Sequence, residues 1–183
     1  MKRAVSVILA VLLICLAAGC ACADDPFEGM KVYYEGQYKA GTDFTPGEYV
    51  LINTSSGFSG YFCISRDANQ DDIIANDLFE VNSIVTVKSG EYLQLSRCVA
   101  VDIDDFYSRY TIKTENPGTM LRVGYDIQPG EYKVTAEEGK TGYYCIYNDS
   151  RHTDIVKNDL FKNSSGVTVR SGQYLILSRC YIK

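Results

Sequence analysis

Residues 85–95 read VTVKSGEYLQL and carry the clearest structural pattern in the chain. Val85 and Val87 alternate with Thr86 and Lys88 before a Ser-Gly pair, and apolar residues alternate again after it. A period of two indicates a strand with one buried face, and a Ser-Gly pair between two such runs predicts a β-hairpin. Residues 167–177 read VTVRSGQYLIL, so we expect the same hairpin a second time.

The repetition extends well beyond the hairpin. Residues 39–100 align with residues 122–182 across a single one-residue gap, and the shared landmarks include the segments PGEY, NDLF and SRC. Duplication of one module explains this pattern. A residue that the fold needs should recur in both copies, whereas a single-copy active site should not. The recurring residues belong to turns, strands and cysteine positions, so the repeat identifies a scaffold and almost no chemistry.

The expected fold class is all-β, with two tandem small β-sandwich or barrel-like modules after an N-terminal signal peptide. We expect the signal over residues 1–19, or to residue 23 if the chain is not a lipoprotein, and a tether over residues 20–35. The modules then occupy residues 36–100 and 118–183. Residues 101–117 contain apolar residues every few positions, which predicts a segment that packs on one or both modules. An added strand is one form that this segment could take.

Two local questions stay open in the sequence. Residues 73–79 are compatible with a short strand or with one helical turn. Strict alternation along residues 91–99 would place Arg97 on the same face as Leu93 and Leu95, which is unfavourable for a buried arginine. Either the strand has left the core by that point, or a bulge near Ser96 resets the alternation.

The N-terminus has the features of an export signal. Lys2 and Arg3 precede an uncharged apolar stretch over residues 5–18 that is too short to cross a bilayer comfortably. Two cleavage sites compete. Residues 21–23, ACA, would release a soluble chain, whereas residues 16–20, LAAGC, are similar to a bacterial lipobox in which Cys20 becomes lipidated and is the first mature residue.

The charge balance argues against two classes of partner. The net charge is −5 for the whole chain and −7 once Lys2 and Arg3 leave with the signal. Nucleic acids and anionic membrane surfaces attract basic stripes, and the basic residues here are scattered. We therefore expect no nucleic-acid partner, and a membrane association only through a possible lipid anchor. The oligomeric state is left open.

Four cysteines remain beyond the signal and its processing site. The interval from Cys63 to Cys98 equals the interval from Cys145 to Cys180, so duplication favours one disulfide within each module. A bond closing a loop of about 35 residues would add roughly 3 kcal/mol to a module with a small core. Free thiols are the alternative. No metal site is expected, because zinc sites bring cysteines in close pairs.

Candidate catalytic groups are few. His152 is the only histidine and is expected to be a surface-loop residue. The recurring carboxylates Glu48 and Asp77, with their counterparts Glu131 and Asp159, are expected to serve turns. Calcium is a weaker alternative for the acidic loop that contains Asp67, Asp71 and Asp72. We expect no catalytic residues and no cofactor.

The combined pattern resembles a module of uncharacterised secreted proteins and lipoproteins of Gram-positive bacteria. Its landmarks here are Pro46-Gly47-Glu48-Tyr49, Gly60-Tyr61-Phe62, Asn76-Asp77 and Val85-Thr86-Val87, and both copies carry them. The resemblance implies extracellular bacterial life and a β-rich fold, and it brings no activity or catalytic residue with it.

We therefore expect an exported, lipid-anchored or extracellular, non-enzymatic envelope protein. Its duplicated modules, rich in tyrosine, would present a binding or structural surface to an envelope glycan or protein. Two rival classes stay open: a carbohydrate-active enzyme that uses Asp or Glu residues, and a secreted, disulfide-stapled inhibitor or effector.

Overall fold

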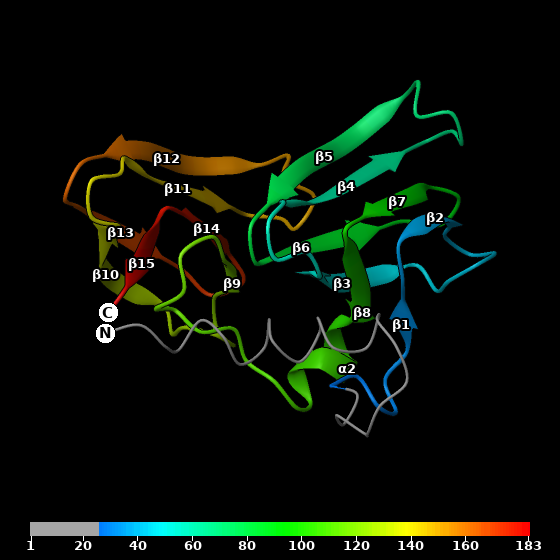
Figure 1. The fold of residues 1–183 in the computed structure, drawn as a ribbon, viewed down its shortest axis with the longest axis horizontal. Helices are drawn as coiled ribbons and strands as arrows, with labels where there is room; N and C mark the ends of the chain where they lie inside the picture. The colour runs from blue at the N-terminus through cyan, green and yellow to red at the C-terminus, as the bar shows by residue number, and fades with distance from the viewer. Residues whose placement is uncertain (1–25) are drawn as a thin grey trace.

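The computed structural model describes residues 26–183 and is almost entirely made of β-strands (Figure 1). The predicted signal peptide and the lipidation site Cys20 lie outside the described residues. The all-β prediction is confirmed: antiparallel strands form four sheets, two in each half of the chain. Among residues 26–183, no helix is long and apolar enough to cross a lipid bilayer.

The first half packs two four-stranded sheets. One has the strand order β1-β8-β3-β6 and the other β2-β7-β4-β5. The strand bounds are β1 Val32–Tyr33, β2 Gly36–Lys39, β3 Gly47–Asn53, β4 Gly60–Ser65, β5 Ile73–Phe79, β6 Asn82–Val87, β7 Tyr92–Ser96 and β8 Cys98–Asp102. The stretch that was ambiguous in sequence is thus strand β5, with a register shift opposite Ile64 and Ser65.

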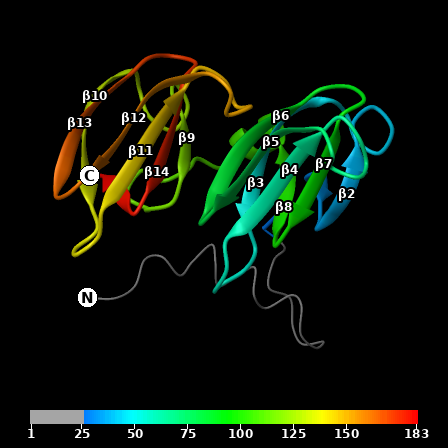
Figure 2. The ribbon, with the colours of Figure 1, turned by 90° about the horizontal axis from the view of Figure 1, so that it is seen from above.

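The second half follows the same order of pairing. Its sheets are β13-β10-β15 and β12-β11-β14-β9, seen at the left of Figure 2. The bounds are β9 Met120–Arg122, β10 Gly130–Ala136, β11 Gly142–Tyr147, β12 Ile155–Phe161, β13 Ser164–Val169, β14 Tyr174–Ser178 and β15 Cys180–Ile182. Residues matched in sequence have matched partners: Tyr61 pairs with Ser96, as Tyr143 pairs with Ser178. Duplication as the origin of this likeness stays a prediction.

The arginine in each SRC segment is where the chain changes sheet. Strand β7 ends at Ser96 in one sheet, and β8 begins at Cys98 in the other. Between them Arg97 has a φ of 57°, and Arg179 has a φ of 53° at the corresponding point. Neither explanation left open by the sequence describes this fully: the chain changes sheet at Arg97 without leaving the core, because Cys98 and Val99 are buried.

The segment between the halves is packed. It contains a short helix, α2, Ile103–Tyr107, whose N-cap Asp102 accepts hydrogen bonds from the backbone N–H groups of Asp104 and Asp105. Ile103 and Phe106 point into the core, and the Tyr110 hydroxyl donates to the carbonyl of Pro26 at 2.6 Å. No helical period in the sequence indicates this helix.

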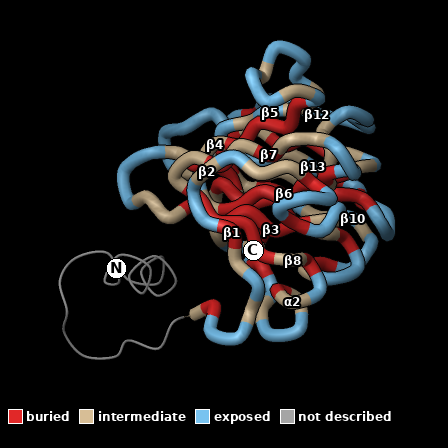
Figure 3. The backbone as a smooth tube through the Cα atoms, turned by 90° about the vertical axis from the view of Figure 1, so that its right-hand side faces the viewer, coloured by how far each residue is buried: buried red, intermediate tan, exposed pale blue. Residues whose placement is uncertain are grey.

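One hydrophobic core joins the two halves. It combines the interior of the second half with α2 and with the outer face of the β8-β3-β6 sheet, including Val50, Ile84 and Val101. The corresponding positions of the second half carry Lys133, Gly166 and Lys183, which are exposed. The same face is therefore apolar where it is covered and polar where it meets solvent. In Figure 3 the buried residues lie mostly along the strands, and the loops are mostly exposed.

Candidate functional site

The least exposed ion pairs of the described residues lie at the junction of the two halves. The loop of residues 148–154, between β11 and β12, contacts strand β6 of the first half. We call this loop the docking loop. Asp149 shapes it, because its Oδ1 accepts the N–H groups of Arg151 at 2.9 Å and Thr153 at 3.1 Å. Partial burial opposes the charge of Asp149, but hydrogen bonds from the Thr153 hydroxyl and from backbone N–H groups outweigh it and lower its pKa.

Arg151 extends from the docking loop to the first half and forms a two-pronged ion pair. Its Nη1 and Nη2 each lie 2.9 Å from an oxygen of Glu91, and Nη1 also donates to the carbonyl of Thr86 at 3.2 Å. The side chains of Arg151 and Glu91 are only 14% and 13% exposed. Burial opposes the charge of Glu91, but the Arg151 hydrogen bond, the hydrogen bond from the Lys88 N–H and the two nearby positive charges together outweigh it, so the pKa of Glu91 is lowered.

The side chain of His152 is only 7% exposed, so the expectation of a surface-loop histidine is wrong. Its ring stacks on Tyr147 with 5.1 Å between centroids and meets Phe62 edge-on at 5.4 Å. Nε2 lies 3.4 Å from the carbonyl of Ile84, and Nδ1 lies 3.6 Å from Asp77. Asp77 lies within strand β5 and its carboxylate faces this histidine. The expectation that Asp77 serves a turn is therefore wrong.

Together these contacts cover the free edge of strand β6. Strand β6 is the last strand of its sheet and would otherwise present unpaired backbone groups. Arg151 and His152 lie against its outward carbonyls, and the N–H of Ile84 donates to Met120 Sδ at 3.2 Å. The side chain of Asn82 then exchanges two hydrogen bonds with the backbone of Met120, at 2.9 and 3.3 Å.

A second polar group closes the junction on its other side. Glu48 pairs with Arg122 at 3.3 Å and accepts a hydrogen bond from the Tyr174 hydroxyl. Burial, together with Glu48, raises the pKa of Tyr174 to about 12. The Arg122 guanidinium lies 4.1 Å from the Tyr125 ring centroid. Glu48 therefore has a role that its equivalent Glu131 lacks, because Glu131 is exposed.

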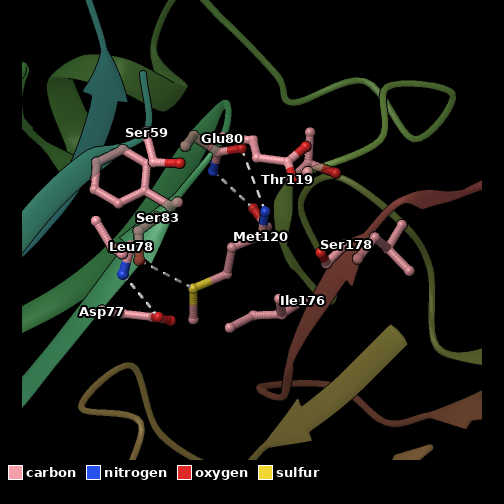
Figure 4. Close-up of a pocket in the computed structure, with 13 residues that line it drawn as sticks. Ser59, Asp77, Leu78, Glu80, Ser83, Thr119, Met120, Ile176 and Ser178 are labelled. Atoms are coloured by element: carbon pink, nitrogen blue, oxygen red, sulfur yellow. Dashed lines mark hydrogen bonds between the residues drawn. The ribbon is translucent and has the colours of Figure 1, made fainter. Parts of the chain in front are cut away.

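The junction also encloses a small cavity, shown in Figure 4, of about 100 Å³. Met120 and Ile176 line it from the second half, and Asp77, Glu80 and Ser83 line it from the first. This volume is well below the roughly 300 Å³ at which small-molecule sites begin. A larger open hollow of about 320 Å³ lies beside Glu48 and Asp149, whose carboxylate oxygens are already engaged within the protein.

The acidic groups considered from sequence are occupied in similar ways. Asp67 accepts backbone N–H groups from Asn69 and Asp72, each at 2.8 Å, which is an Asx turn within its own loop. Asp72 pairs with Arg66 at 2.7 Å. Among residues 26–183, no group of three His, Cys, Asp or Glu side chains is placed to hold a metal ion.

The predicted disulfides are absent from the described structure: Cys63, Cys98, Cys145 and Cys180 are all buried free thiols. The expected close approach of strands does occur, since Cys98 Sγ lies 3.4 Å from the carbonyl of Tyr61. Cys98 belongs to a core cluster with Phe62 and Ile64, however, and Cys63 lies between these two along strand β4. Successive residues of a strand point to opposite faces, so Cys63 points away from Cys98.

The sequence pattern did not indicate the junction residues Arg151, Glu91, Arg122 and Tyr174. A signal was present in the differences between the two aligned segments, because Arg151 and His152 align with Asn69 and Gln70, and Glu91 aligns with Gln173. No family model, no curated protein and no solved structure matches the chain.

Proposed function

We propose that the chain is an exported, non-enzymatic cell-envelope protein, anchored by a lipid at Cys20, whose joined β-modules present a binding or structural surface. The resemblance to modules of secreted proteins and lipoproteins of Gram-positive bacteria, together with the N-terminal signal, supports export. The surface would be offered to an envelope glycan or to another protein.

One observation carries the non-enzymatic half of the proposal. The ionisable side chains that come together, Arg151 with Glu91, Arg122 with Glu48 and His152 beside Asp77, bridge the two halves. A typical glycoside hydrolase needs a pair of carboxylates that are free to face a substrate across several ångströms. Glu91 and Glu48 instead pair with Arg151 and Arg122, and Asp77 lies beside His152, which fits a rigid scaffold.

The anchor is tested by metabolic labelling with a palmitate analogue. Label should enter the wild-type protein and be absent from Cys20→Ala. Cys22→Ala is the matched control, because it changes a neighbouring cysteine outside the lipobox position, and it should keep the label. Equal labelling of the wild type and Cys20→Ala, or a mature protein that begins at Asp24, would refute the anchor.

The binding half is tested by screening the intact mature protein against purified cell-wall glycans and envelope proteins. Retention on one component, without turnover of that component, is the expected result. Release of reducing sugar from a glycan would favour the rival class of carbohydrate-active enzymes. In that case Glu80→Gln, which removes a carboxylate that lines the junction cavity, tests whether this carboxylate is needed for the release of sugar.

A further inference from the structure

Strand β12 is an open sheet edge with apolar side chains. It is the last strand of the sheet β12-β11-β14-β9, and every residue from Ile155 to Leu160 is exposed. Figure 1 shows it along the outer margin of the second half. Ile155, Val156 and Leu160 are 52%, 47% and 64% exposed. Sheet edges that stay solvated are normally short, charged or covered, and three large apolar side chains are unusual on such an edge.

The sequence of β12 is complementary to itself in the antiparallel direction. Backbone hydrogen-bonding groups alternate between the two sides of a strand, so a strand that pairs with its own copy about a two-fold axis must place a residue on that axis. With Asn158 on the axis, Lys157 lies opposite Asp159 of the second copy, and Val156 lies opposite Leu160. Symmetry produces each of these pairs twice.

The neighbouring registers are unfavourable. An axis at Lys157 would place two lysines face to face, and an axis at Asp159 would do the same with two aspartates. Opposite charges directly across a strand pair stabilise it, and like charges destabilise it. Lys157 and Asp159 lie on one face of the strand, where Lys157 Nζ is 5.7 Å from the Tyr144 ring centroid and Asp159 accepts from Ser165 at 3.3 Å. Both are therefore held beside the edge.

The corresponding edge of the first half does not share this complementarity. Strand β5 is also the last strand of its sheet, but Ala75 stands at the position of Lys157. Asp77, at the position of Asp159, faces His152 within the junction. Charge complementarity therefore distinguishes β12 from β5, although Leu78 and Leu160 are equally exposed at 61% and 64%.

From this geometry we infer that two copies of the chain associate through antiparallel pairing of their β12 strands about Asn158. The two four-stranded sheets would then join into one continuous sheet across the dimer. This interface is independent of export and lipidation, and it leaves the junction between the halves intact.

The test uses a soluble form that starts at Asp24 and so keeps every residue that the structure describes. Sedimentation equilibrium over a range of concentrations should show a monomer–dimer equilibrium. Leu160→Asp should weaken the dimer at least about tenfold. Leu78→Asp, the same change on the other edge, should leave it unchanged, and both variants should keep the wild-type circular dichroism spectrum because both side chains are exposed.

Charge reversal tests the register. Lys157→Asp places two like-charge pairs across the axis and should weaken dimerisation about tenfold. The double variant Lys157→Asp with Asp159→Lys recreates the opposite-charge pairs and should restore it. A wild-type protein that stays monomeric at all concentrations would overturn the inference. So would a dimer lost in Leu78→Asp but kept in Leu160→Asp, or a double variant as weak as the single one.

Discussion

Arg151 has two partners in the other half of the chain, which makes it the most informative single residue for stability. Arg151→Ala leaves Glu91 as an almost fully buried carboxylate without its ion pair, so the free energy of unfolding should fall by about 3 kcal/mol. Urea denaturation measures the change. Lys140→Ala removes the exposed pair with Glu137 and should leave stability almost unchanged, because exposed ion pairs are screened by solvent.

The residues that align with Arg151 and Glu91 provide a second control for the same pair. Asn69 and Gln173 stand at the positions of Arg151 and Glu91. The double variant Arg151→Asn with Glu91→Gln should therefore lose less stability than the sum of the two single variants, because it leaves no unpaired charge. Additive losses would show that the two side chains act separately.

Glu91 also gives a pH dependence with a definite sign. Its pKa is lowered in the folded protein, so its contribution to stability is complete above the unfolded pKa of about 4.3. That contribution is lost as the pH falls through the lower folded pKa. The difference in unfolding free energy between wild type and Glu91→Gln should accordingly shrink as the pH is lowered from about 7 to about 3. A constant difference would contradict this assignment.

The number of free thiols can be measured by their reaction with a thiol reagent before and after unfolding. Burial raises the pKa of the Cys98 and Cys180 thiols to about 11, so little thiolate is present near neutral pH. A thiol reagent should react very slowly with the folded protein, and it should label Cys63, Cys98, Cys145 and Cys180 after unfolding without a reductant. Peptide mapping identifies the sites. Protection of any of them in the unfolded chain would reveal a disulfide and contradict the free-thiol structure.

At the scale of elements, the turn at Arg179 joins β14 to β15 in the left-handed region of the backbone. A β-branched residue is poorly compatible with a positive φ, whereas asparagine tolerates it. Arg179→Val should therefore be less stable than Arg179→Asn by about 1–2 kcal/mol, as thermal or urea denaturation can determine. The same two substitutions at the exposed Lys133, inside strand β10, should reverse the order, because strands favour valine over asparagine.

The elements that sequence could predict are those with local periodicity. The alternation of Val85 and Val87 around a Ser-Gly pair led correctly to strands β6 and β7. Helix α2 was missed because its five residues are too few to show a helical period. The disulfides were predicted wrongly because equal spacing shows that two pairs of cysteines have equivalent positions, but not that the two members of a pair point toward each other.

At the scale of the whole molecule, the junction was hidden from the sequence because it depends on which faces meet in space. The junction is indicated by the positions at which the two aligned segments differ, and not by the positions at which they agree. Val50 and Ile84 have the counterparts Lys133 and Gly166, a change from apolar to solvent-compatible residues on a single sheet face. Positions that agree between the two segments indicate what one half needs to fold. Positions that differ indicate which half has this sheet face covered by the other half.

The shared core predicts that the two halves unfold together. Separating them would expose the apolar outer face around Val50, Ile84 and Val101, whose burial contributes about 1.5–3 kcal/mol per large side chain. The sequence contains no tryptophan, so Tyr38→Trp in β2 and Tyr132→Trp in β10 each place a single fluorescent probe in one half. For each variant, the urea midpoint measured by tryptophan fluorescence should coincide with the midpoint measured by circular dichroism on that same variant. Two separated transitions, with Arg151→Ala shifting only one of them, would mean that the junction does not couple the halves.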